Sequence, residues 1–559
     1  MGKYAGFDRA GLALAGAVAA AALGLRLWGI GWGFPGLFNG DEGHHVNMAV
    51  ALGRGTLNPG VFKYPSLWFY TLFGAFGLFF LAWSGLGLRH SVREFGQLFV
   101  WRPERFYLTA RLVSAAFSVL ALERVWSAGR ELGSARLGMW AAGLLAVSLP
   151  LVEQAHAAKP DSLLFFWSAC AWAAALRYFV TGRPRALLAA GVLTGLAVST
   201  QYTAAPLVAA PATAWLVRRL VPDGRQRPSW GLGLSAAALI PAAFLAGSPF
   251  ILLDHAAFAR DMADHATLNF ARAPAGWHSF ANAFTFAGPW WLCGALVAAG
   301  AAALLRRDRP LAAMLLAPPV AQMSFLAFSD KGGAARYLIA SLPALALVAA
   351  HGVEALGGAR LAGAAARAAV LALIMFPGGL RSAAYAAALN RPDTRLAAQT
   401  WIEANLPIGT RIVLGAEPDT PPLRSSREQV ARLLERTRAA GHPRARYYEL
   451  MLESHPGGGY DLLRMKRDAG DMDTGPWHRQ WSDASRDTLD VAAGLSAARA
   501  AGASVAVLSS MGLGFGTPDV GRFLDETERQ GRLLAEFLPE EGRVNGPHIK
   551  VYRIDEGAR

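Results

Sequence analysis

The fold is decided by the apolar run at residues 10–30, AGLALAGAVAAAALGLRLWGI, and by the polar motif NGDEGHH that follows at residues 39–45. A membrane-spanning helix needs about 20 predominantly apolar residues, and this run has that length. A cleavable signal peptide would have a shorter apolar stretch and a small-residue cleavage site. The sequence therefore predicts an uncleaved first membrane helix, with Lys3 and Arg9 on its cytoplasmic side and adjacent carboxylates just beyond its outer end.

The composition of the 559-residue chain is typical of a membrane protein. Hydrophobic residues make up 53% of the chain and charged residues only 17%, with a mean hydropathy of +0.27. Soluble domains carry roughly 25% charged residues, so the composition argues against a disordered chain and an ordinary cytosolic enzyme. Cys170 and Cys293 both lie inside apolar runs, and their placement fits neither a disulfide scaffold nor a metal site.

Twelve apolar runs are candidates for membrane helices. They lie near residues 10–30, 66–86, 105–128, 136–151, 161–180, 187–201, 203–218, 231–249, 284–305, 310–328, 334–352 and 362–380. We expect about eleven of them to cross the membrane. The predicted fold is a mostly α-helical polytopic membrane protein with a transmembrane domain over residues 1–385.

The net charge of +14 lies entirely in the apolar part of the chain. Residues 1–387 hold 31 Lys and Arg against 16 Asp and Glu (+15), and residues 388–559 hold the remaining 23 against 24 (−1). Short basic loops tend to face the cytoplasm, and the basic loops here fall at every second connection. They contain Arg130 and Arg136, Arg183 and Arg185, Arg218 to Arg227, Arg306 to Arg309, and Arg360 and Arg367. Because these residues are dispersed and form no recognised motif, we expect no nucleic-acid partner.

The run at residues 66–86 interrupts this alternation. If it crossed the membrane fully, all five basic connections would face outward, against the positive-inside tendency. We therefore expect Ser66–Trp83 to dip into the membrane or lie at its surface, and then to return to the same face. Residues 31–104 then form one long external loop.

Residues 386–559 change in character and predict a soluble α/β domain outside the membrane. Their periodicity predicts helices at Leu396–Asn405 and Arg427–Ala440, and strands at Arg411–Leu414, Ser504–Leu508 and Ile549–Ile554.

Charges that the positive-inside tendency does not explain gather in the loops assigned to the outer face. Asp41 and Glu42 are adjacent carboxylates at a membrane edge, where desolvation is costly and charged groups usually have a function. Three of only six lysines, Lys63, Lys159 and Lys331, also fall in these loops. Snorkelling would explain any single lysine, but cations beside carboxylates suit an anionic membrane-embedded ligand such as a lipid phosphate.

Five short motifs, taken in their order and spacing, resemble those of the polyprenyl-phosphate-sugar-dependent transferases of the protein O-mannosyltransferase type, which include the aminoarabinose transferases of lipid A. The motifs are Asp41-Glu42, Lys63-Tyr64-Pro65, Arg111 to Ser114, Lys159-Pro160-Asp161, and Arg336-Tyr337-Leu338 with Pro343. The resemblance covers about residues 10–380 and implies a multispanning glycosyltransferase of the GT-C fold in the inner membrane. Asp393-Thr394-Arg395 and Gly546-Pro547-His548 resemble the external domain of bacterial members, but no catalytic role transfers to them.

The resemblance implies a polyprenyl-phosphate-linked sugar donor, attack by a hydroxyl of an acceptor lipid, glycan or protein, and inversion at the anomeric carbon. We expect Asp41 to be the general base, since a neighbouring carboxylate can raise its pKa. Glu42 would orient the acceptor or hold a cation. Asp161, which could also cap its helix, would be a further catalytic carboxylate. The candidate substrate-binding residues are Lys63, Tyr64, Arg111, Lys159, Lys331, Arg336, Tyr337, His44 and His45.

The sequence does not require a metal. Asp41, Glu42 and Asp161 could hold a divalent cation, and carboxylates would suit Mg²⁺ or Mn²⁺. His44 and His45 depart from the family's usual pattern, and we expect them to form hydrogen bonds near the sugar. The external loop at residues 249–283 could close over the site.

Three other functions are compatible with parts of this pattern. A cell-envelope polysaccharide ligase or polymerase would share the lipid-linked donor and the external site. A transporter or flippase of lipid-linked substrates would carry ionisable groups at mid-bilayer depth in repeated halves, whereas the acidic groups here lie at one edge. A non-catalytic scaffold would tolerate the loss of Asp41 and Asp161.

Overall fold

The computed structural model describes residues 9–221, 227–270, 280, 284–328, 335–355, 364–415, 418–465, 485–511 and 518–555. The chain divides into two compact units. Unit 1 comprises Met1–Ile30, His44–Phe76 and Thr109–Ala387, and unit 2 comprises Gly31–Gly43, Gly77–Leu108 and Ala388–Arg559. Asp41 and Glu42 thus belong to the same unit as the C-terminal residues.

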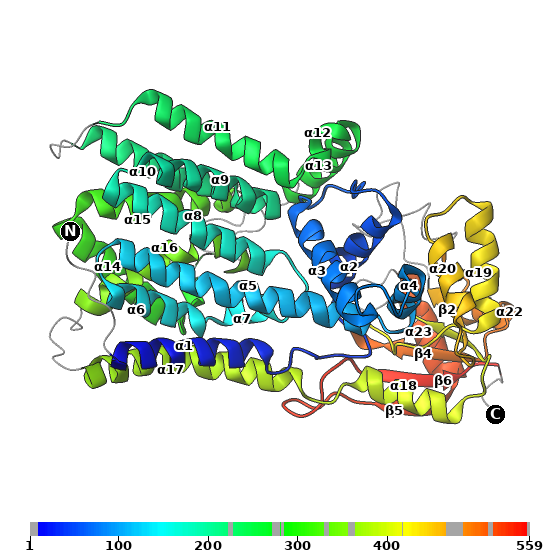
Figure 1. The fold of residues 1–559 in the computed structure, drawn as a ribbon. Helices are drawn as coiled ribbons and strands as arrows, with labels where there is room; N and C mark the ends of the chain where they lie inside the picture. Colours follow the sequence, from blue (N-terminus) through cyan, green and yellow to red (C-terminus); the bar gives the residue numbers. More distant parts are fainter. Residues whose placement is uncertain are drawn as a thin grey trace. The chain divides into compact units, whose positions relative to one another are not determined.

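Unit 1 is a helix bundle (Figure 1). Its elements are α1 (Arg9–Leu27), η1 (Leu52–Arg54), α6 (Ala135–Ala146), α7 (Leu149–Ala155), α8 (Asp161–Thr181), α9 (Pro184–Thr200), η2 (Tyr202–Val208), α10 (Ala209–Leu220), α11 (Trp230–Gly247), α12 (Phe250–Leu253), α13 (His255–Phe270), α14 (Trp290–Arg307), α15 (Arg309–Ala327), η4 (Ala335–Ser341), α16 (Leu342–Ala355) and most of α17 (Ala364–Leu389). Three further helices have residues in both units: α2 (Gly40–Ala51), α3 (Leu67–Ser84) and α5 (Glu104–Glu131).

Each of the twelve apolar runs coincides with a helix or with consecutive helical segments, which confirms the mostly helical membrane fold. Among the described residues, seven helices are long and apolar enough to cross a membrane, or eight if the α6–α7 pair, bent by 63°, forms one span. The seven are Leu67–Ser84, Glu104–Glu131, Asp161–Thr181, Trp230–Gly247, Arg309–Ala327, Ala335–Ala355 and Ala372–Leu389. The count of eleven spans and the return of α3 to the same face stay predictions.

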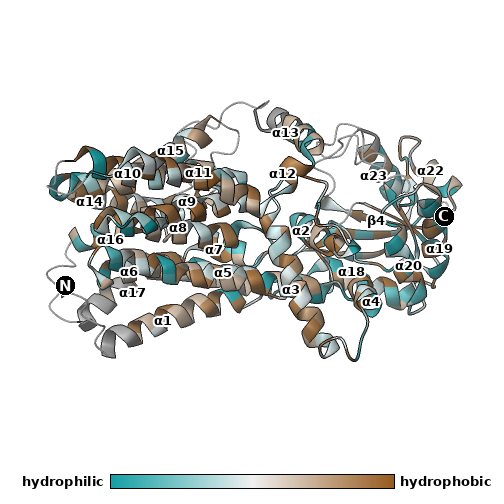
Figure 2. Cartoon of the chain, turned by 45° about the horizontal axis from the view of Figure 1, so that its top comes forward, coloured by the Kyte–Doolittle hydropathy of each residue, from teal (hydrophilic) through white to brown (hydrophobic). Residues whose placement is uncertain are grey.

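The helix flanks of unit 1 are apolar on the outside as well as the inside. Figure 2 shows hydrophobic residues along much of the bundle helices, and large apolar side chains such as Leu120, Leu234 and Leu373 are exposed. In the absence of a bilayer such surfaces would be exposed to water, so these flanks are the lipid-facing sides of a multi-pass membrane protein.

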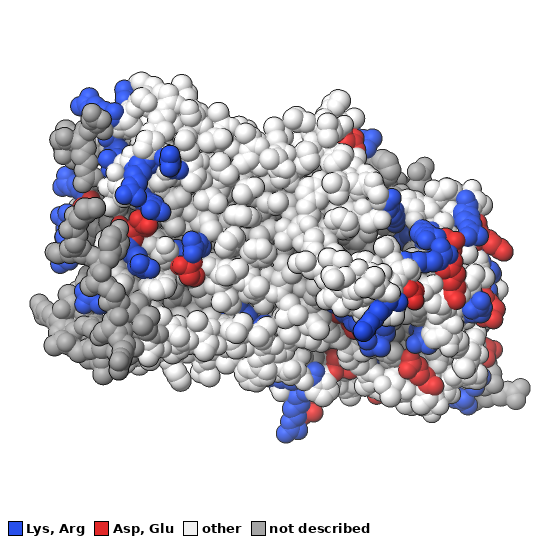
Figure 3. Space-filling view, viewed as in Figure 1, with Lys and Arg blue, Asp and Glu red and all other residues white. Residues whose placement is uncertain are grey.

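Arginines gather at one end of unit 1. In Figure 3 the flank of the bundle is nearly free of charge, whereas Lys and Arg cluster around the ends of α10 and α14. Contacts join several basic connections there: Arg218 Nη1 donates to Phe179 O at 2.7 Å, and Arg136 lies 4.0 Å from Glu354. Several of the predicted basic connections therefore share one end of the bundle, as far as the structure describes them, while Arg360 lies outside the described residues.

Unit 2 contains a six-stranded sheet of order β3-β2-β1-β4-β6-β5. Its strands are β1 (Arg411–Leu414), β2 (Asp461–Met465), β3 (Thr488–Leu489), β4 (Val505–Ser509), β5 (Arg532–Phe537) and β6 (Ile549–Arg553), and its helices are α4 (Val92–Trp101), α18 (Thr394–Asn405), α19 (Arg427–Ala439), α20 (Ala445–Glu453), α22 (Leu495–Ala500) and α23 (Pro518–Gln530). The first four strands are parallel, and β6 runs antiparallel to β4 and β5. The predicted α/β class is confirmed, although β2, β3 and β5 were not expected from the sequence.

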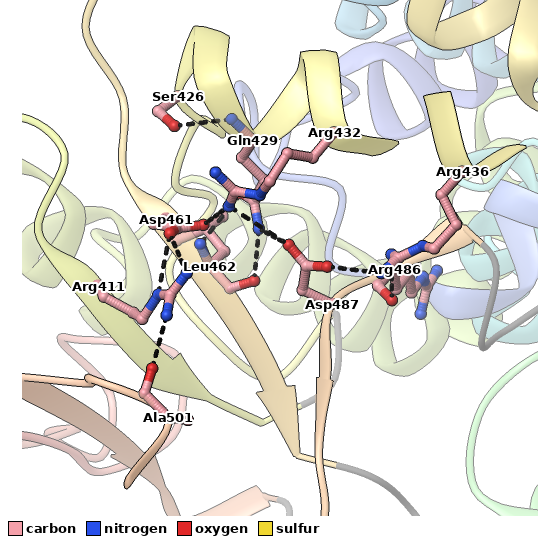
Figure 4. A network of polar contacts seen from close by, with 10 residues as sticks. All are labelled: Arg411, Ser426, Gln429, Arg432, Arg436, Asp461, Leu462, Arg486, Asp487 and Ala501. Atoms are coloured by element: carbon pink, nitrogen blue, oxygen red, sulfur yellow. Dashed lines mark hydrogen bonds and ion pairs between the residues drawn. The ribbon is translucent and has the colours of Figure 1, made fainter. Parts of the chain in front are cut away.

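A polar network fixes α19 against the N-terminal ends of the parallel strands (Figure 4). Asp461 accepts hydrogen bonds from Arg411 Nε at 2.9 Å and from Arg432 Nη2 at 2.6 Å. Gln429 Nε2 donates to Leu462 O at 2.8 Å and to Asp487 at 2.9 Å. Because these groups satisfy one another, we interpret the network as structural.

Candidate functional site

Segments that are far apart in the sequence meet around His45. The His45 ring lies 4.7 Å from the Tyr64 ring and 5.8 Å from the Phe69 ring, between ring centroids, and His44 lies 5.8 Å from Tyr64. The charge of Lys159 also reaches His45, since it contributes to lowering the pKa of the imidazole. We call His44, His45, Tyr64, Phe69 and Lys159 the His45 cluster, and it unites three of the predicted motifs.

His45 is a buried, neutral imidazole. Only 1% of the residue is exposed. Burial lowers the pKa of His45 well below its usual value, and repulsion from His44 and Lys159 lowers it further. A neutral imidazole has one N–H donor and one acceptor, and neither ring nitrogen of His45 has a hydrogen-bond partner among the described residues. The ring can therefore donate one hydrogen bond to a hydroxyl-bearing ligand and accept another from it.

The segment Lys63-Tyr64-Pro65 is anchored at its first end by two side chains. The backbone N–H of Phe62 donates to Asp261 Oδ2 at 2.6 Å, and the Tyr202 hydroxyl donates to Phe62 O at 3.0 Å. Phe62 itself is fully buried. The backbone N–H and C=O of Phe62 are thus held by α13 and η2. These two bonds fix the position of the backbone directly before Lys63.

The other end of this segment is anchored by serines. Ser66 N donates to Ser248 Oγ at 2.9 Å, and Ser248 Oγ lies 2.8 Å from Ser199 Oγ. The residues between Phe62 and Ser66 are therefore a fixed support rather than a loose loop, although they have no regular secondary structure.

Lys159 and Asp161 form the turn between α7 and α8 and are unusually buried for charged residues. Lys159 is 7% exposed and Asp161 is 2% exposed. Charged groups at a membrane edge are this buried only where local partners or a ligand stabilise them. Asp161 begins α8, where the helix dipole favours a negative charge.

Two buried side chains, Arg111 and His156, hold the exit of α1. Arg111 is fully buried, and its Nη1 donates to Ile30 O at 2.9 Å. His156 also contacts the exit of α1, with Nε2 3.0 Å from Trp28 O. Arg111, predicted to bind substrate, therefore uses at least one nitrogen to position the backbone.

Arg26 stabilises the break between α6 and α7. It is fully buried, and its guanidinium donates to Ser118 Oγ at 2.8 Å and to Ala146 O at 2.8 Å, with longer bonds to Ala22 O and Leu145 O. Carbonyls released at a helix break need such donors inside a membrane. The residue fixes the bend that leads to Lys159.

Asp41 and Glu42 lie in the first turn of α2, within unit 2. Asn39 Oδ1 accepts a hydrogen bond from Asp41 N at 3.1 Å. Asp41 is exposed, whereas Glu42 is completely buried. The two adjacent carboxylates thus have different environments, which suits different roles.

The remaining predicted residues are not part of the His45 cluster as described. Arg336 Nη2 donates to the Tyr337 hydroxyl at 2.9 Å, and Gln322 Nε2 donates to Tyr337 O at 2.7 Å. Both lie on η4, which packs against α7 and α8. Lys331 lies outside the described residues. Among the described residues, no group of three or more His, Cys, Asp or Glu side chains could hold a metal ion.

Two comparisons now bear on the fold. Residues 107–245 match the family model described as dolichyl-phosphate-mannose-protein mannosyltransferase. Two solved structures of ArnT from Cupriavidus metallidurans are 16% identical to this chain. The apo structure aligns over 97% of this chain and 98% of its own with a TM-score of 0.56, and the structure bound to undecaprenyl phosphate aligns over 97% of each with a TM-score of 0.55. The chain has the GT-C glycosyltransferase fold.

These matches confirm the predicted GT-C fold. They also confirm that the chain resembles transferases of the protein O-mannosyltransferase and aminoarabinose-transferase type. An oligosaccharyltransferase from Archaeoglobus fulgidus is 14% identical over 89% of this chain and 69% of its own, but its TM-score of 0.46 supports no conclusion. No curated protein matches the sequence.

Sequence reasoning missed three residues that shape this region. Phe69 closes the His45 cluster, His156 holds the exit of α1, and Arg26 braces the α6–α7 break. Arg26 gave a usable signal, since a lone arginine inside an apolar run is costly and needs a reason. The roles of Phe69 and His156 depend on tertiary contacts that no spacing reveals.

Proposed function

We propose that this GT-C protein transfers a sugar from a polyprenyl-phosphate donor to an acceptor hydroxyl at the extracytoplasmic face of the inner membrane, with inversion at the anomeric carbon. The observation that carries the proposal is the His45 cluster. It brings a buried lysine, a neutral imidazole and two aromatic rings together beside Asp161, at the edge of an apolar bundle. A buried cation suits a lipid phosphate, and a two-function imidazole suits a sugar hydroxyl.

The proposed face follows from the two ends of α8. The helix has 21 residues between Asp161 and Thr181, a length of about 30 Å that matches the hydrocarbon core of a bilayer. Arg183 and Arg185 follow its far end. Since basic loops favour the cytoplasm, Asp161 would lie at the outer face, the N-terminus would be cytoplasmic, and the C-terminal domain extracytoplasmic.

Lys159 and Lys63 are our candidates for the donor phosphate. Positive charge near the departing phosphate would stabilise the negative charge that develops as the glycosidic bond breaks. His45 and Tyr64 would contact the sugar. Arg111 and Arg336 remain candidates for binding the phosphate. Each would also position the protein itself, because Arg111 Nη1 bonds to Ile30 O and Arg336 Nη2 bonds to the Tyr337 hydroxyl.

Asp41 is our candidate base, and Glu42 would orient the acceptor or hold a cation. An exposed carboxylate at a helix N-terminus can reach an acceptor arriving from outside the membrane, whereas a buried one such as Glu42 is better suited to fix geometry. Asp161 would orient Lys159 or the sugar.

The test is an assay of Asp41→Asn with a polyprenyl-phosphate sugar in detergent, beside Glu123→Gln, which changes an exposed carboxylate on α5. Loss of a general base should lower the rate by about 10²- to 10⁴-fold, with little change in Glu123→Gln. An Asp41→Asn rate near wild type would eliminate Asp41 as the base. A product carrying one added sugar supports this function, and a long transferred chain would identify a polymer ligase.

A further inference from the structure

Arg395, from a motif without an assigned role, stacks on the segment that leads to Asp41. Its guanidinium carbon lies 3.5 Å from the centroid of the Phe38 ring, and both residues belong to unit 2. Phe38 is 8% exposed, as is the Arg395 side chain. A cation on an aromatic face is attracted more strongly when both are desolvated, so this is a buried stack and not a surface contact.

Two C-terminal residues hold the Arg395 guanidinium with three hydrogen bonds. Nε and Nη2 donate to the two carboxylate oxygens of Asp393 at 2.8 and 2.7 Å, and Nη1 donates to Pro418 O at 3.0 Å. The forked pair with Asp393 fixes the plane of the guanidinium. The planar guanidinium of Arg395 is therefore held in a fixed orientation over the Phe38 ring.

The motif around Arg395 is itself locked to the other C-terminal motif. Thr394 Oγ1 donates to Pro547 O at 2.6 Å, and Thr394 N donates to Asn545 O at 2.9 Å. Both segments resembled the external domain of bacterial members. Their joint effect here is a rigid base for Arg395.

Gly36 also lies close to the Phe38 ring. A Cβ at Gly36 would lie 2.4 Å from Phe38 Cζ, so no larger residue fits there without moving the ring. The ring therefore has both Gly36 and Arg395 as close neighbours. A Cβ at Gly40 would lie 4.0 Å from Pro418 Cδ, so the first residue of α2 lies near the C-terminal residues.

We propose that Arg395 is a positioning residue, through which the C-terminal domain sets the position of Asp41 and Glu42 by holding Phe38. Phe38 precedes Asp41 by three residues, and Asn39 Oδ1 connects the intervening turn to Asp41 N. The inference rests on the proposed function, in which Asp41 of this segment is the general base. It gives the external domain a part in catalysis without contact to substrate.

The experiment measures kcat and the donor KM for Arg395→Met, Arg395→Lys, Phe38→Leu and Gly36→Ala. The matched control is Arg424→Met, which removes a second arginine of the same unit from the ring of Trp101 at 5.4 Å. Small misplacements of a catalytic group cost up to about 10²-fold in rate. We expect kcat to fall about 10- to 100-fold in all four variants, including Arg395→Lys, because lysine keeps the charge but lacks the planar fork.

The donor KM should stay within about twofold of wild type, since the donor is assigned to the His45 cluster; a general loss of structure would change both constants. Hydrogen exchange supplies a readout that needs no activity, with faster exchange expected at the amides of residues 39–43. The double variant Arg395→Met with Phe38→Leu should be no slower than the slower single variant, because the two act as one contact.

The inference is overturned if Arg395→Met and Gly36→Ala keep the kcat and amide exchange of Arg424→Met while Asp41→Asn is inactive. If Arg395→Met fails to fold, Gly36→Ala decides, since it leaves the Asp393–Arg395 pair intact. If Asp41→Asn is active, Asp41 is not the base, and the exchange measurement alone decides whether Arg395 holds the segment.

Discussion

The two ends of α8 carry charge in opposite ways. At the Asp161 end, the charged side chains are buried: Asp161 is 2% exposed and Lys159 7%. At the far end, Arg183 and Arg185 are exposed, and the side chain of Arg177 is 51% exposed, 3.8 Å from Glu131. One helix thus separates charges that solvent stabilises from charges that only the protein or a ligand can stabilise.

We interpret the exposed charges as setting the orientation of the helix in the membrane, and the buried charges as serving the sugar-transfer reaction. Exposed arginines stay hydrated, so their desolvation cost is small, and salt screens their interactions. Their main effect is to keep the loop that carries them on the cytoplasmic side. Buried charges carry a desolvation cost that a fold retains only where they are needed. The buried end is therefore where substitutions should be most damaging to activity.

Between the two ends of α8, the largest effect is expected for Asp161→Asn. The change keeps the shape of the side chain but removes a buried charge that we propose orients Lys159 or the sugar. We expect the transfer rate to fall about 10²- to 10³-fold, measured by single-turnover assay. A loss under threefold would show that Asp161 has no part in catalysis.

A smaller effect is expected for His45→Phe, which keeps an aromatic ring but removes both nitrogens. Loss of hydrogen bonds to one sugar hydroxyl should lower kcat/KM about tenfold or more. An unchanged kcat/KM would show that His45 only fills space between Tyr64 and Phe69.

The same residue makes the stability dependent on pH. The pKa of His45 is well below its usual value in the folded protein, whereas in the unfolded chain it is about 6.5. Above about pH 6.5 both states are neutral at this site. As the pH falls below that value the unfolded chain binds a proton that the folded protein excludes, so the free energy of unfolding falls by up to about 1.4 kcal/mol per pH unit.

Thermal unfolding of detergent-purified protein measures this term. The wild-type Tm should drop more steeply between about pH 7 and pH 5 than the Tm of His45→Phe. Parallel curves for the two proteins would contradict a depressed pKa at His45.

A moderate effect is expected for Asp261→Ala, which removes the acceptor for Phe62 N and loosens one end of the Lys63-Tyr64 segment. The donor KM should rise about five- to tenfold, while Asp264→Ala, an exposed change on the same helix, leaves it unchanged. Asp261→Asn should restore most of the affinity because its amide oxygen still accepts the bond. If the Asn variant were as weak as the Ala variant, the charge rather than the hydrogen bond would be the cause.

The smallest effect is expected at the exposed end. The double variant Arg183→Gln with Arg185→Gln should keep its rate within about twofold of wild type in detergent, as exposed charges contribute little. A loss comparable to that of Asp161→Asn would remove the contrast between the two ends.

Periodicity was sufficient to predict the helices of the twelve apolar runs, and α18 and α19 of unit 2. The helices α13, α20, α22 and α23 were not expected from the sequence. The α/β class of unit 2 could be predicted from three strands because their apolar runs are continuous. β5 was missed because its sequence, RLLAEF, is a short apolar run without strict alternation, which fits a helix as well as a strand. The order of the sheet depends on long-range pairing that no local pattern contains.

The site could be predicted only in part. Lys63, Lys159 and Asp161 stood out because each is charged where charge is expensive. The anchoring by Asp261 and Tyr202 and the stack of Arg395 on Phe38 could not be predicted, since each joins segments more than 100 residues apart. Such contacts are consequences of packing, and only the folded chain reveals them.

The central claim, that the buried end of α8 binds the lipid phosphate, is tested most directly by the affinity of the purified protein for undecaprenyl phosphate. Wild type would be compared with Lys159→Met and with Arg183→Met, one cation from each end. We expect Lys159→Met to weaken binding by about tenfold or more, since a buried charge-assisted contact is lost, and Arg183→Met to bind like wild type. Equal affinities in all three, or a loss confined to Arg183→Met, would contradict the account.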